Sequence, residues 1–98
     1  MDSTQRRLSS AAWSMLEALS GFRKSVHKEL DFINSVSSDL PSDKLEDAIL
    51  ETEFLASEIA NFLSELNNMD SEESEKKYAV LSASFDNLKA LINVLVGK

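Results

Sequence analysis

Apolar residues recur along three segments of this chain at alternating steps of three and four residues. Such spacing places them on one face of a helix, with a repeat of seven residues. A repeat held over several heptads favours helices that cross at a shallow angle in a left-handed bundle. The positions are Leu8, Ala12, Met15, Leu19, Phe22, Val26, Leu30, Ile33 and Val36; Leu45, Ala48, Thr52, Leu55, Ile59, Phe62, Leu66 and Met69; and Tyr78, Leu81, Phe85, Leu88, Ile92 and Leu95.

Two breaks separate these patterns. Pro41, the only proline, lacks the amide hydrogen of a continuing helix, and Ser42 or Asp43 can cap the next one. Asp70 precedes Glu73 by three residues, a spacing similar to a capping box, although Ser or Thr is the usual cap. Connections this short make neighbouring helices antiparallel. We predict one all-α domain, an antiparallel up-down-up three-helix bundle with coiled-coil-like heptad packing, spanning 1–98 with helices at about 4–37, 42–67 and 71–96.

The composition removes most catalytic chemistries. The chain has no cysteine, which excludes disulfides, thiolate metal sites and cysteine nucleophiles. Its one histidine, His27, is too little for an imidazole metal cage or a Ser-His-Asp relay, and two glycines cannot build a phosphate-binding loop. We therefore predict that the protein is not an enzyme and has no catalytic residue, metal site or cofactor.

Charge and hydropathy argue against two classes of partner. The net charge of −7 repels phosphate backbones and anionic lipids, so we predict no nucleic-acid and no membrane binding. The longest apolar stretch, Ala90 to Val96, is interrupted by Asn93 and is far shorter than a membrane span. A cytoplasmic location is expected, with a nuclear or host-cell location as the alternatives.

Charge is also unevenly distributed along the chain. Residues 1–28 carry a net charge of +3, the stretch from Glu29 to Glu75 carries −13, and the remainder carries +3. The second helix is therefore acidic, and the heptad numbering places Glu51, Glu58 and Glu65 on one flank, with Glu65 facing Lys77. Two interpretations remain open: a solvated or internally paired flank, or a docking site for a basic partner.

Some apolar residues fall outside the predicted core positions. Leu50 and Phe54 lie one helical turn apart on the outward face of the second helix. Two interpretations apply to them, an ordinary widening of the core or a surface for a partner. Trp13 lies beside the first pattern, and we expect it to be buried in the core. The candidate partner-binding residues at one end of the bundle are Phe32, Leu50, Phe54, Leu91 and Val94.

These patterns favour a non-catalytic function. We expect a protein-protein interaction module, a small helical adaptor or scaffold subunit of a larger assembly, that associates through helix-on-helix packing with protein partners or as a homo-oligomer. The alternative is a small acidic chaperone or inhibitor that masks a basic or amphipathic segment of a client protein. A dimer with helices exchanged between protomers fits the same heptads.

Overall fold

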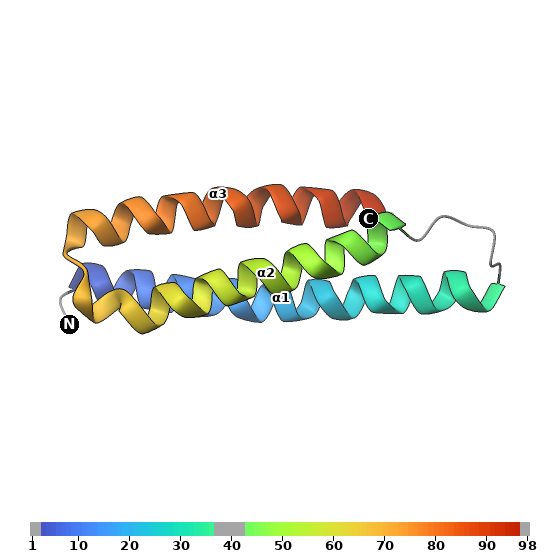
Figure 1. The fold of residues 1–98 in the computed structure, drawn as a ribbon, viewed down its shortest axis with the longest axis horizontal. Coiled ribbons are helices and arrows are strands. Elements are labelled where there is room, and N and C mark those ends of the chain that lie inside the picture. The colour runs from blue at the N-terminus through green and yellow to red at the C-terminus, as the bar shows by residue number, and fades with distance from the viewer. Residues whose placement is uncertain (1–2, 37–42, 97–98) are drawn as a thin grey trace.

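The computed structural model describes residues 3–36 and 43–96 and shows three helices packed side by side (Figure 1). Helix α1 spans Ser3–Val36, α2 spans Asp43–Glu65, a short 3-10 helix η1 spans Leu66–Asn68, and α3 spans Ser71–Leu95. Each long helix packs against the other two, and α2 runs antiparallel to α1 and α3. The described part of the chain has no strand, so the predicted all-α, antiparallel three-helix bundle is confirmed.

The core consists of the residues that the seven-residue repeat selects. All eight repeat positions of the second pattern, from Leu45 to Met69, are buried. Between α1 and α3 the rings of Phe22 and Phe85 stack with their centroids 5.7 Å apart. The side chain of Val36, the predicted break at Pro41 and the capping role of Ser42 lie outside the described residues.

A buried side chain fastens the start of α1 to the turn between α2 and α3. The Nε2 atom of Gln5 donates hydrogen bonds to the backbone oxygens of Leu66 and Met69, both at 2.8 Å. The Leu66 oxygen also accepts a 3.3 Å hydrogen bond from the backbone amide of Met69, so Gln5 adds a second donor at the end of η1. The carboxylate of Asp70 accepts a 2.8 Å hydrogen bond from the backbone amide of Glu73, so Asp70 is the predicted cap of α3.

Among the described residues, one ion pair links each pair of long helices. All six side chains are largely exposed, so each pair contributes only about 0–1 kcal/mol. These surface ion pairs between helices thus balance part of the uneven charge of the sequence. The pairs are Arg23 with Glu53 at 3.0 Å (α1 to α2), Arg7 with Glu75 at 3.0 Å (α1 to α3) and Lys77 with Glu65 at 4.0 Å (α2 to α3).

Gly21 lies in the middle of α1 with open space beside it. A Cβ atom added there meets nothing within 4 Å. Glycine is about 1 kcal/mol less favourable than alanine inside a helix. We therefore expect Gly21→Ala to raise the free energy of unfolding by about 1 kcal/mol, measured by urea denaturation. An unchanged or lowered stability would show that α1 requires glycine at this position.

Candidate functional site

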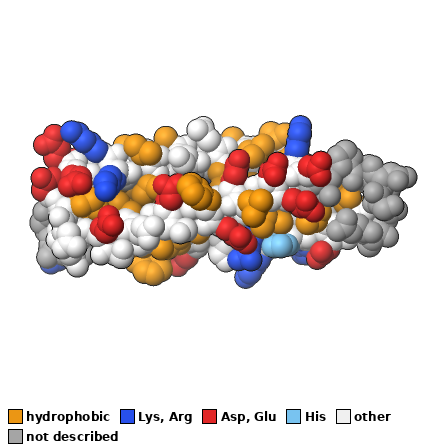
Figure 2. All heavy atoms as spheres, viewed as in Figure 1, with side chains coloured by type: hydrophobic (Ala, Val, Ile, Leu, Met, Phe, Trp, Pro, Cys, Tyr) orange, Lys and Arg blue, Asp and Glu red, His pale blue; other side chains and the backbone are white. Residues whose placement is uncertain are grey.

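A shallow groove runs between α2 and α3 and contains much of the predicted site. It consists of two hollows, and Glu58 lines both. Because the two helices are antiparallel, Phe54 of α2 lies level with Ser84 and Leu88 of α3. Figure 2 shows hydrophobic side chains next to acidic ones across the middle of the molecule. The lining residues are Glu51, Phe54, Leu55, Glu58, Asn61, Phe62 and Glu65 from α2, and Lys76, Lys77, Val80, Leu81, Ser84 and Leu88 from α3.

Leu50 and Phe54 lie on the surface, exposed to 63% and 68% of their area. Their interpretation as a widened core is therefore wrong. The repeat positions of α2 already fill the space between the helices, so Leu50 and Phe54 lie outside the buried face of α2.

Leu91 and Val94 extend this apolar surface onto α3. Leu91 follows the groove residue Ser84 by seven residues, which places both on the same flank of the helix. Val94 lies one turn further along and is 78% exposed. In the antiparallel arrangement, Leu91 lies level with Leu50. The structure therefore places Phe54 in the α2/α3 groove and Leu91 and Val94 on the flank of α3 that borders it. Leu50 lines neither hollow of the groove and lies one helical turn from Phe54 on the outward side of α2.

Phe32 lies elsewhere. It lines a different groove, between α1 and α3, together with Phe22, Ile92 and Val96. Helix α3 separates this groove from Phe54, so the five predicted residues do not form one patch. Sequence position along antiparallel helices indicates which residues lie at the same end of a bundle, but not on which side of it.

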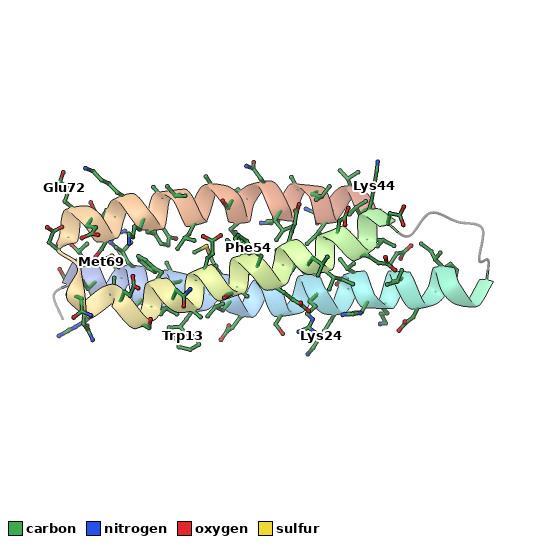
Figure 3. The ribbon with its side chains drawn as sticks, viewed as in Figure 1. Trp13, Lys24, Lys44, Phe54, Met69 and Glu72 are labelled. Carbon is green, nitrogen blue, oxygen red and sulfur yellow. The ribbon has the colours of Figure 1, made fainter. Side chains whose placement is uncertain are left out.

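Trp13 is 57% exposed, so the prediction that it belongs to the core was wrong. The repeat position is taken by its neighbour Ala12, which is fully buried, and one further residue turns the side chain about 100° away from the core. Figure 3 shows Trp13 at the edge of the bundle opposite α3, whereas Phe54 lies on the side of α2 that faces α3.

The acidic flank of α2 follows the groove, and its charge is neutralised at one end only. Lys77 lies 4.0 Å from Glu65 and 3.9 Å from Glu73, so the predicted proximity of Glu65 and Lys77 is confirmed. Glu51 and Glu58, before and after Phe54, form no ion pair within residues 3–36 and 43–96. The groove therefore has a neutralised end and a negatively charged middle.

The described residues contain neither a candidate metal site nor a candidate membrane span. No three of their His, Asp or Glu side chains cluster in a way that would hold a metal ion. None of the described helices combines the length and apolar character needed to cross a bilayer. The α2/α3 groove offers a partner the exposed apolar side chain of Phe54 and the carboxylates of Glu51 and Glu58.

Three-helix bundles support many unrelated functions, so this fold alone assigns none. The surface residues of the α2/α3 groove are more informative, because function depends on a site rather than on an architecture. Comparison with known proteins adds no further constraint on that site. No family model matches the chain, and no curated protein and no solved structure matches it significantly.

Proposed function

We propose that this protein is a non-catalytic binding module that accepts a helix of another protein along the α2/α3 groove. The observation that supports this function is the exposure of Phe54, Leu91 and Val94 in and beside the α2/α3 groove, with the exposed Leu50 one helical turn from Phe54. Large apolar side chains gathered on a surface are typical of a protein interface, whereas scattered ones are not. Two helices with a groove between them are also a usual receptor for an amphipathic helix.

The energetics favour an occupied groove. Full burial of a leucine or phenylalanine side chain stabilises a complex by about 1.5–3 kcal/mol relative to leaving that side chain in water. Leu50 and Phe54 leave most of that area in water in the free chain. A partner helix that covers both residues regains this contribution, and a few buried aromatic or aliphatic anchors commonly dominate the binding free energy.

A partner of different sequence fits better than a second copy of this chain. In an antiparallel twofold pairing of α2 helices centred between Phe54 and Leu55, Glu51 of one copy lies opposite Glu58 of the other. Like charges placed opposite each other destabilise an interface. The net charge of −7 on each chain adds a further repulsion.

Designed peptides test this function. We expect amphipathic helical peptides of about 21 residues, with leucine at the repeat positions, to bind the wild-type chain. The double substitution Leu50→Ser and Phe54→Ser should weaken binding at least about tenfold, because it removes both apolar anchors. Trp13→Ser, a matched exposed aromatic on another face, should leave it unchanged. Fluorescence anisotropy measures the Kd, and circular dichroism checks that each variant is folded.

Two outcomes would contradict the proposal. Peptide binding that is insensitive to Leu50 and Phe54, or absent, removes the groove as a receptor. A wild-type dimer in sedimentation equilibrium that the double substitution dissociates identifies a second copy of the chain as the occupant.

A further inference from the structure

The charge of the groove restricts which helix it accepts. We infer that the partner is a basic amphipathic helix, with Lys or Arg beside its apolar anchors, that lies over the middle of the α2/α3 groove. This inference rests on the proposed function, because it specifies the partner of the same face. It follows from where the carboxylates of α2 are neutralised and where they are not.

In the middle of the groove, Glu51 and Glu58 form no ion pair with any described residue. Glu51 precedes Phe54 by three residues and Glu58 follows it by four, so both carboxylates lie close to the main apolar anchor. Both line the groove beside α3. In the hollow that contains Phe54, the α3 residues Ser84 and Leu88 are uncharged. In the adjoining hollow Glu58 shares the lining with Lys76 and Lys77, whose ion pairs are with other carboxylates.

The bases of the groove lie toward its ends. At one end Lys77 is engaged by Glu65 and Glu73, and Lys76 lies 3.2 Å from Glu72. At the other end Lys44 lies in the first turn of α2, about two turns before Glu51 (Figure 3). A cationic partner therefore gains most over the stretch from Leu50 to Glu58.

The distance between the two carboxylates determines how far apart the basic residues of the partner helix should lie. Glu51 and Glu58 are seven residues apart, which is about 10.5 Å along a helix. A partner helix that lies along α2 presents side chains of its own at the same interval. Two Lys or Arg residues one heptad apart, on the flank of an apolar stripe, thus match both carboxylates at once.

The other groove that contains a predicted contact residue lacks this match. The groove between α1 and α3 that contains Phe32 is lined by one base and one acid, Lys28 and Glu29, so it favours neither sign of charge. Of the two grooves that contain predicted contact residues, the α2/α3 groove is the one that combines an exposed apolar anchor with carboxylates that no described residue pairs.

Three peptides with identical leucine anchors test the inference; their flanking positions carry lysine, glutamine or glutamate. At low salt we expect the lysine peptide to bind about tenfold more tightly than the glutamine peptide, and the glutamate peptide to bind most weakly. The double substitution Glu51→Gln and Glu58→Gln should abolish the preference for lysine and leave the Kd of the glutamine peptide unchanged. The preference should also shrink as the salt concentration rises.

A matched control separates local from overall charge. Glu17→Gln with Asp86→Asn removes the same net charge from residues that do not line the α2/α3 groove, and it should preserve the preference. Loss of the preference in this control would overturn the inference, because overall charge alone would then explain it. Equal affinity of the lysine and glutamine peptides, with binding still dependent on Phe54, would overturn the basic partner and leave the proposed function intact. Binding by none of the peptides would overturn both.

Discussion

Leu55→Ala is expected to lower the free energy of unfolding by about 3 kcal/mol, whereas Leu50→Ala should change it by less than about 0.5 kcal/mol. The two leucines lie five residues apart in α2, and both substitutions carry the same small change in helix propensity. Leu55 is only 5% exposed, so alanine leaves a cavity among its neighbours, while Leu50 is 63% exposed and leaves none. Urea denaturation of the two variants measures the difference.

This comparison also tests the binding face. If the free energy of unfolding fell by about 3 kcal/mol at both positions, Leu50 would be buried in solution. The proposed binding surface would then lack one of its exposed apolar residues. Phe54→Ala provides a second test, because replacing an exposed phenylalanine should also change the free energy of unfolding only slightly.

Gln5→Met is expected to lower the free energy of unfolding by about 2 kcal/mol. Methionine resembles glutamine in length but has no donor, so the backbone oxygens of Leu66 and Met69 lose the two 2.8 Å hydrogen bonds. The Leu66 oxygen keeps its hydrogen bond from the Met69 amide, but the Met69 oxygen loses the Gln5 donor, and a buried acceptor left unsatisfied costs about 1–3 kcal/mol. Thermal or urea unfolding measures the loss, and Gln5→Glu should be at least as destabilising because a carboxylate cannot donate.

Arg6→Met provides the matched control, since Arg6 is the exposed neighbour of Gln5 in α1. It should change stability by less than about 0.5 kcal/mol. If Gln5→Met were equally harmless, the two hydrogen bonds would contribute nothing to the attachment of α1 to the turn before α3.

The inward face of each helix was predictable from the sequence. Leu45, Thr52 and Met69 are buried as the heptad spacing predicts, even though Thr52 is polar. Its hydroxyl donates a 2.7 Å hydrogen bond to the backbone oxygen of Ala48 one turn earlier, so its burial leaves no donor unsatisfied. Periodicity predicts burial well because it depends only on the geometry of a single helix.

The lateral contacts were not predictable in the same way. Phe32 was expected beside Phe54 but lines the groove on the other side of α3. Gln5 gave no signal at all, because its acceptors are backbone atoms 61 and 64 residues away, and backbone atoms carry no sequence identity. Both cases depend on which neighbour each flank meets, which single-helix patterns do not encode.

The three ion pairs between helices have a consequence for chirality. Three helices can pack around a common core in two arrangements of opposite handedness. The core residues alone distinguish these two arrangements poorly. In the mirror image, the flank of α1 that carries Arg23 would turn away from Glu53, and the flank of α2 that carries Glu65 would turn away from Lys77. The three surface ion pairs contribute little to the stability of the bundle, but they favour one of its two possible handed arrangements.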